Sequence, residues 1–121
     1  MTKIFLDTYA LIEIIKGNEN YKKYLEKESV TSLFHLYEFY FALLREYGEE
    51  IAKKYFLQFK YKEISVKEDD IFLASKIKLQ NIQKRLSYAD CLGYSMALQR
   101  GMKFLTGDKE FEHFKDVEFA K

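Results

Sequence analysis

The chain has 121 residues, a common size for one domain, and its 48% hydrophobic and 32% charged residues exclude a disordered or membrane-spanning protein. Its 20 basic and 19 acidic residues give a net charge of +1, so any nucleic-acid site must come from a local patch rather than from the global charge. The only cysteine, Cys91, excludes an internal disulfide and a multi-cysteine zinc site, and we expect it inside a helix of a cytoplasmic protein.

The first half of the chain alternates between strand-like and helix-like segments. Residues 4–6 are apolar without alternation, which is typical of a parallel strand covered on both faces. A helix is predicted over residues 8–16, a short helix over 21–27 and a second strand over 29–32. Residues 33–47 are rich in Leu, Phe and Tyr and predict a largely buried helix.

The second half continues the alternation. Helices are predicted over residues 49–60, 69–79 and 87–100, with a further short helix ending near residue 114. Strands are predicted over residues 62–66, 102–105 and 117–119, the first and last of them at sheet edges. No linker or repeat divides the sequence, and no signal peptide is expected. We therefore predict one domain over residues 1–121, an α/β/α three-layer sandwich with a mainly parallel sheet of about five strands.

Two acidic residues lie just after predicted strands. Asp7 ends the first strand, and Asp108 follows the strand over 102–105 after a Thr-Gly turn. Parallel α/β folds bind ligands beyond the carboxyl ends of their strands, so the two carboxylates share one crevice if these strands are neighbours. Asp is also a favoured helix N-cap, which gives both residues an alternative, purely structural role.

Two further acids lie on predicted helices. Asp90 ends the motif Ser87-Tyr88-Ala89-Asp90, which also fits a capping box. Glu38 lies in an apolar helix, where a buried carboxylate costs several kcal/mol unless it is paired or bound to a metal. A salt bridge to Lys or Arg is the structural alternative, and His35 is one turn away as another partner.

Acidic side chains gathered in one pocket repel each other, and such a cluster persists at neutral pH mainly around a divalent cation. Oxygen ligands without paired Cys or His favour Mg²⁺ or Mn²⁺ over Zn²⁺. One or two such ions can activate water and stabilise a departing oxygen in phosphodiester hydrolysis. The pattern therefore indicates nuclease chemistry.

Four motifs together resemble the acidic motifs of PIN-domain proteins across essentially the whole chain. They are Phe5-Leu6-Asp7-Thr8, a Glu in the helix after the second strand, Leu86-Ser87-Tyr88-Ala89-Asp90 and Phe104-Leu105-Thr106-Gly107-Asp108-Lys109-Glu110-Phe111. In length the chain is similar to the VapC-type toxins of toxin–antitoxin pairs. The resemblance implies catalysis and metal binding by four acids: Asp7, Glu38, Asp90 and Asp108.

The resemblance also assigns supporting roles. Thr106 orients the cluster through its hydroxyl, Thr8 and Ser87 belong to the motifs, and Glu110 is a secondary acid where the family often has Asp. It further implies a five-stranded parallel sheet, RNA cleavage leaving a 5′-phosphate, homodimers and a cognate antitoxin protein. Basic residues before the third motif are candidates for phosphate contacts or, alternatively, a solvated helix face: Lys76, Lys78, Lys84 and Arg85.

Three other functions are compatible with parts of this pattern. A haloacid-dehalogenase-like phosphatase also has an Asp after its first strand, but it needs a second acid where this chain has Tyr9. A catalytically idle PIN-like RNA-binding module conflicts with the intact set of four acids. A PIN nuclease of RNA processing or quality control has the same residues as a toxin, and an antitoxin gene beside its own would distinguish the two.

Overall fold

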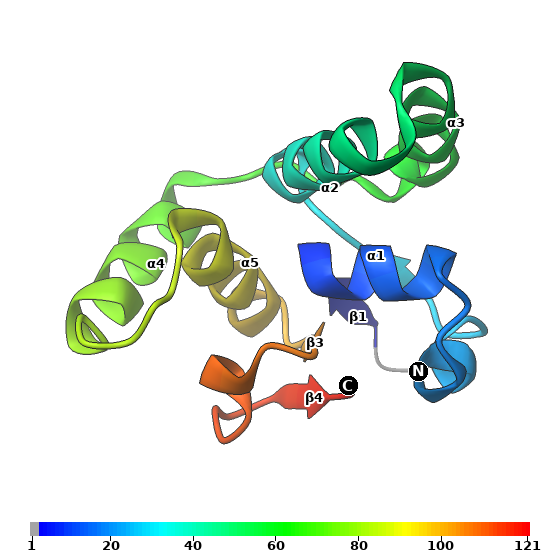
Figure 1. Ribbon diagram of the computed structural model, residues 1–121. Coiled ribbons are helices and arrows are strands. Elements are labelled where there is room, and N and C mark those ends of the chain that lie inside the picture. The colour runs from blue at the N-terminus through cyan, green and yellow to red at the C-terminus, as the bar shows by residue number, and fades with distance from the viewer. Residues whose placement is uncertain (1–2) are drawn as a thin grey trace.

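A parallel sheet lies at the centre of the computed structural model, which describes residues 3–121 (Figure 1). Over these residues its four strands are β1 (Ile4–Leu6), β2 (Ser29–Val30), β3 (Lys103–Thr106) and β4 (Val117–Phe119), in the order β2-β1-β3-β4. β1 pairs with both β2 and β3, and Leu6 lies opposite Leu105. The strand order therefore reverses between β1 and β3, and a crevice is expected at their carboxyl ends.

Helices cover both faces of the sheet. Ile4, Leu6 and Leu105 point into a core shared with α1 (Thr8–Ile15), α2 (Leu33–Tyr47) and α3 (Glu49–Phe59). Phe5 and Phe104 point the other way, into a core shared with α4 (Glu68–Gln80) and α5 (Tyr88–Gln99). Successive strand residues face opposite sides, which is why one short apolar run supplies both cores. The predicted three-layer sandwich is confirmed.

Short segments differ from their predictions in detail. Three of them are 3₁₀ turns: η1 (Glu19–Tyr24), η2 (Lys60–Lys62) and η3 (Lys109–Phe111). The strand expected over residues 62–66 is reduced to one parallel bridge between Glu63 and Thr31. The chain turns into α2 directly after Thr31, with Ser32 as the N-cap, so β2 is too short to pair with a further strand. The sheet therefore has four strands where about five were expected.

α2 is far less buried than predicted. Only four of its 15 residues are buried, namely His35, Leu36, Phe39 and Leu43. On its outer faces Tyr37 is 71% exposed and Phe41 is 55% exposed. The prediction of a largely buried helix was wrong because apolar side chains cover almost the whole circumference, whereas the domain packs against one side of it.

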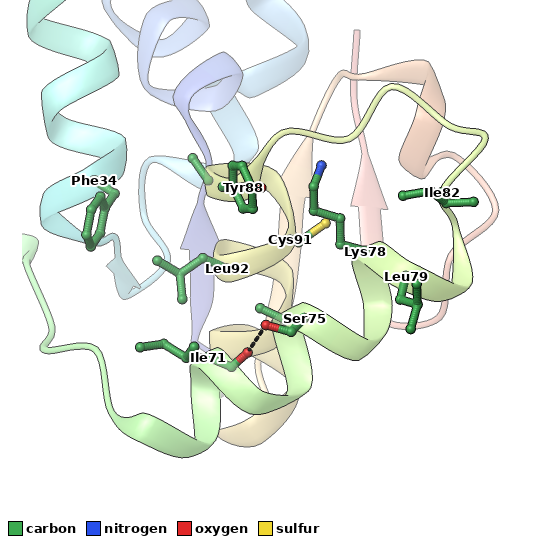
Figure 2. A pocket seen from close by; sticks show the side chains of 11 residues that line it. Phe34, Ile71, Ser75, Lys78, Leu79, Ile82, Tyr88, Cys91 and Leu92 are labelled. Atoms are coloured by element: carbon green, nitrogen blue, oxygen red, sulfur yellow. Dashed lines mark hydrogen bonds between the residues drawn. The ribbon is translucent and has the colours of Figure 1, made fainter.

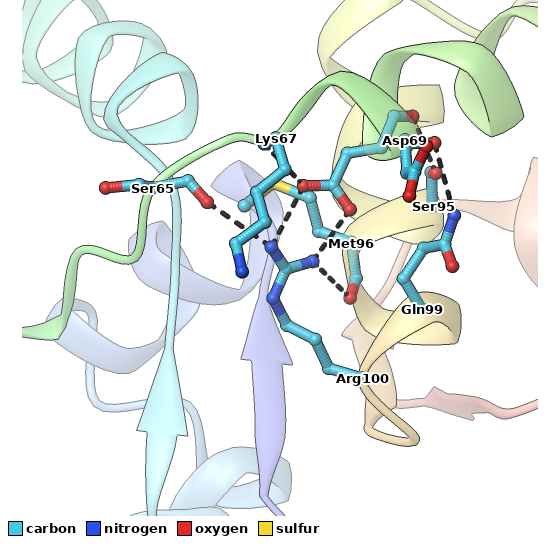
Figure 3. A network of polar contacts seen from close by, with 8 residues as sticks. Ser65, Lys67, Asp69, Ser95, Met96, Gln99 and Arg100 are labelled. Atoms are coloured by element: carbon cyan, nitrogen blue, oxygen red, sulfur yellow. Dashed lines mark hydrogen bonds and ion pairs between the residues drawn. The ribbon is translucent and has the colours of Figure 1, made fainter.

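α4 and α5 form a hairpin held by a buried ion pair (Figure 3). The Arg100 guanidinium donates to both carboxylate oxygens of Asp70, at 2.8 and 2.9 Å, and Asp70 is only 1% exposed. The Ser95 hydroxyl donates to the Asp70 carbonyl oxygen at 2.7 Å. These bonds join α4 to the middle and the C-terminal end of α5, whereas Asp90 lies in the first turn of α5.

Cys91 is buried in α5, as predicted. Within the described range 3–121, no helix combines the length and the apolar character needed to cross a bilayer.

Candidate functional site

Asp7 and Asp108 meet at the carboxyl edge of the sheet, because β1 and β3 are paired neighbours. The Asp7 N–H donates to the carbonyl oxygen of Leu105 at 3.4 Å. The hydroxyl oxygen of Thr106, which is fully buried, accepts the Asp108 N–H at 3.0 Å, and this side chain also hydrogen-bonds the Asp7 carboxyl. Thr106, the last residue of β3, thus contacts both Asp7 and Asp108.

Glu38 and Asp90 reach the same region from two helices. Glu38, near the middle of α2, accepts a hydrogen bond of 2.6 Å from the hydroxyl of Thr8, the residue after Asp7. Asp90 lies in the first turn of α5, and both acids are half-buried. They line an open hollow of about 610 Å³ together with Thr8, Tyr37, Phe41 and Ser87.

The structural roles considered for the aspartates are all realised. One Asp7 oxygen accepts the Ala10 N–H at 2.8 Å, and one Asp108 oxygen accepts the Glu110 N–H at 3.0 Å. Asp90 and Ser87 form the predicted capping box, with bonds of 2.8 and 3.0 Å. In each cap the backbone N–H contacts a single carboxylate oxygen, so the capping bond itself does not use the second oxygen.

Burial and mutual repulsion raise the pKa values of two of these acids. Desolvation is the main cause that raises the pKa of Asp7 to about 7, and the nearby Asp90 and Asp108 carboxylates add to it. Desolvation likewise raises the pKa of Asp90, with further contributions from Asp108 and Glu38. Each of the four carboxylates therefore senses at least one other, and they form one electrostatic group.

No basic side chain neutralises this group. Across residues 3–121, none of the ion pairs includes Asp7, Glu38, Asp90 or Asp108, so the salt bridge considered for Glu38 is absent there. His35 is not its partner either, since its Nδ1 lies 2.6 Å from Ser32 Oγ. An uncompensated set of carboxylates is the donor set that hard divalent cations prefer.

The carboxylates nevertheless stand apart. In the part of the chain that the structure describes, no three acidic, His or Cys side chains are close enough to hold one ion together. Repulsion between uncompensated like charges opposes closer approach in a protein without metal. The residues fit a metal centre by donor chemistry and by charge, and closing it requires the side chains to draw together.

Other predicted site residues lie to the side. The Glu110 carboxylate is 3.8 Å from the ammonium group of Lys84 and does not join the four acids. Lys78 donates to the Leu86 carbonyl oxygen at 2.7 Å, while Lys76 and Arg85 are exposed. The basic residues therefore border the α4–α5 connection, and two of them have partners within the chain.

Two aromatic side chains of the hollow were missed by the sequence analysis. Phe41 follows Glu38 by three residues on the same side of α2, and Tyr37 precedes Phe41 by four residues, so both aromatic side chains reach the hollow. Their aromatic character was interpreted as core packing. The only available signal was their helical spacing relative to Glu38.

Comparisons with known proteins agree with this geometry. A family model described as the PIN domain matches residues 4–117. No curated protein matches the sequence significantly. Among solved structures, VapC20 of Mycobacterium tuberculosis, described as a toxin cleaving the sarcin-ricin loop, has a TM-score of 0.78 at 18% identity, with 98% of this chain and 99% of that chain covered.

Two further structures are similar over nearly the whole chain. DNA-bound VapBC from Salmonella typhimurium has a TM-score of 0.78 at 18% identity, covering 98% of this chain and 97% of that chain. FitAcB from Neisseria gonorrhoeae has a TM-score of 0.70 at 16% identity, covering 98% and 96%. At these identities the likeness establishes the fold.

Proposed function

Because the chain belongs to the PIN domain family, whose model matches residues 4–117, we propose that it is a metal-dependent endoribonuclease. The observation that carries this proposal is that four carboxylates lie near one another at the switch point of a parallel sheet and that, over residues 3–121, none of them forms an ion pair with a basic side chain. RNA is the proposed substrate, in keeping with the described activity of VapC20, a protein with the same fold.

The four carboxylates Asp7, Glu38, Asp90 and Asp108 would hold Mg²⁺ or Mn²⁺. When bound, the ion supplies the Lewis acid that activates water and stabilises charge on the phosphate oxygens. Thr8 keeps Glu38 turned toward the hollow through the 2.6 Å hydrogen bond, and Thr106 holds the Asp7 carboxyl. The raised pKa of Asp7 means that cation binding displaces a proton near neutral pH.

RNA cleavage with matched variants tests this function. Purified protein is incubated with RNA and Mg²⁺ or Mn²⁺, with and without EDTA, beside Asp7→Asn, Asp90→Asn and the control Asp69→Asn. Asp69 is an exposed acid on α4 outside the hollow, so its variant should cleave like the wild type. Fragments that require metal and vanish in Asp7→Asn and Asp90→Asn are expected; cleavage that survives both substitutions would remove the carboxylate mechanism.

Within this activity we assign the chain the role of a VapC-type toxin acting in the cytoplasm. Several of the similar structures are described as VapBC or toxin–antitoxin complexes. Expression of the wild type should arrest growth, and the Asp7→Asn variant should not. Growth that continues normally while the purified protein cleaves RNA would favour the alternative, a nuclease of RNA processing.

Homodimerisation and antitoxin binding complete the proposal, and the exposed apolar side chains of α2 supply surfaces for them. One hollow of about 380 Å³ lies where Phe34 of α2 faces α4 and α5, as Figure 2 shows, and its wall includes Ile71, Leu79 and Leu92. A second, of about 400 Å³, lies over α2 and α3 and is lined by Leu33, Tyr37, Tyr40, Lys53 and Phe56. Apolar patches of this kind are characteristic of protein interaction sites.

A further inference from the structure

His35 occupies a closed position between α2, β1 and α5. Its side chain is 1% exposed, and its ring packs edge-on against Phe5 of β1 with centroids 5.1 Å apart. Ser32, which caps α2, accepts the His35 N–H at 3.3 Å and lies 2.6 Å from Nδ1. When the Ser32 hydroxyl donates to Nδ1, the second ring nitrogen, Nε2, carries the ring hydrogen.

Nε2 points at α5 without completing a hydrogen bond. Among the described residues it is the buried side-chain nitrogen or oxygen that has no partner. The Ala89 backbone, directly before Asp90 on α5, is the acceptor that faces the ring. The imidazole is therefore held on one side by Ser32 and Phe5 and pressed on the other side against the first turns of α5.

Gly93 is the residue of α5 that makes room for this ring. A Cβ atom placed on Gly93 would lie 2.6 Å from His35 Nε2, closer than real Cβ atoms approach, and 3.0 Å from a Phe104 ring carbon, which is a tight contact. Glycine is also a poor residue for the interior of a 12-residue helix. Its presence is explained by the histidine opposite, which fills the space that a side chain would take.

We propose that His35 and Gly93 act as a spacer that sets the gap between α2 and α5, and with it the separation of Glu38 and Asp90. His35 precedes Glu38 by three residues on α2, and Gly93 follows Asp90 by three residues on α5, so one turn of helix joins each half of the spacer to an acid. His35 is a positioning residue in this role. The inference rests on the proposed metal centre and names what holds its two halves in register.

Gly93→Ala tests the spacer because two effects have opposite signs. Alanine is the better helix former, so without the contact the substitution would stabilise the protein. With the contact, the new methyl group pushes α5 from α2, which lowers the melting temperature in EDTA and weakens Mn²⁺ binding about tenfold, the size typical of losing a support for metal ligands. Mn²⁺ affinity is measured directly by titration, without RNA.

A second substitution and a matched control complete the experiment. His35→Ala in the Gly93→Ala background removes the clash, so the double variant should bind Mn²⁺ more tightly than Gly93→Ala. Ser95→Ala breaks the bond to Asp70 on another side of the same helix, so it should lower stability while leaving Mn²⁺ affinity unchanged.

The outcomes separate this inference from the function on which it rests. If the wild type binds no Mn²⁺, the metal centre itself is wrong and the spacer falls with it. If the wild type binds Mn²⁺ and Gly93→Ala binds it equally well, or if Ser95→Ala weakens binding as much, the spacer is wrong and the metal centre stands. A double variant that binds Mn²⁺ no more tightly than Gly93→Ala would also overturn the spacer.

Discussion

Asp7→Asn should make the metal-free protein more stable at pH 8 and leave its stability almost unchanged at pH 4. Folding raises the pKa of this carboxyl from 3.8 to about 7, chiefly by desolvation. Below pH 3.8 both the folded and the unfolded chain hold the proton. Between pH 3.8 and 7 the unfolded chain ionises first, so the free energy of unfolding falls as pH rises, and above pH 7 the loss is complete.

The size of the effect follows from the shift in pKa. A difference of about 3 units at roughly 1.4 kcal/mol each amounts to about 4 kcal/mol. Asparagine keeps the cap on α1, since Asn and Asp are equally good N-caps, and the attraction of the helix N-terminus for the charged form is already contained in the net pKa. We therefore expect a gain of about 4 kcal/mol above pH 7.

Urea unfolding in EDTA at pH 4.5, 6 and 8 measures this gain. The difference between variant and wild type should grow with pH, and Mn²⁺ should reverse it by stabilising the wild type alone. Asp70→Asn is the matched control: the Arg100 hydrogen bond lowers the pKa of Asp70, so this variant should lose stability at pH 8. Equal differences at all three pH values, or a less stable Asp7→Asn at pH 8, would refute the reasoning.

Two further predictions concern Glu38 and His35, both on α2. Glu38→Gln should change the unfolding free energy of the metal-free protein by less than about 1 kcal/mol, because the half-buried side chain keeps an acceptor for Thr8 and loses a repelling charge. The same variant should lose Mn²⁺ binding. A large fall in its melting temperature in EDTA would show a structural role instead. Desolvation lowers the pKa of His35 from 6.5 to about 4, so its contribution to stability is complete above pH 6.5 and is lost toward pH 4, by about 3 kcal/mol. The acid destabilisation of the wild type, followed by urea unfolding, should be shallower in His35→Gln, and an identical slope would contradict this.

The part of the fold that positions the site was predictable because it depends on local signals. The short apolar run of residues 4–6 is typical of a covered parallel strand, and β1 is such a strand, paired with β3 through Leu6 and Leu105. The capping box at Ser87 is likewise a four-residue pattern, and it formed as predicted. The strand ends therefore predicted the positions of Asp7 and Asp108, and the helix start predicted the position of Asp90.

What the sequence could not predict depends on contacts between distant residues. The apolar circumference of α2 indicates burial, yet the domain covers only one side of the helix. No local pattern tells which of its apolar side chains stay exposed. The ion pair between Asp70 and Arg100 spans 30 positions, and the fit of His35 to Gly93 spans 58 positions. Each of these becomes visible only once the two helices are placed side by side.

Capping and metal binding are compatible roles for the same aspartates. Asp7 and Asp108 are the N-caps of α1 and η3, and Asp90 lies in the first turn of α5. The capping hydrogen bonds lower the pKa values of Asp7 and Asp90, opposing the burial and repulsion that raise them. Helix N-termini also carry partial positive charge. The caps thus fix one oxygen of each carboxylate and hold the group together, at a cost in repulsion that a bound divalent cation would remove.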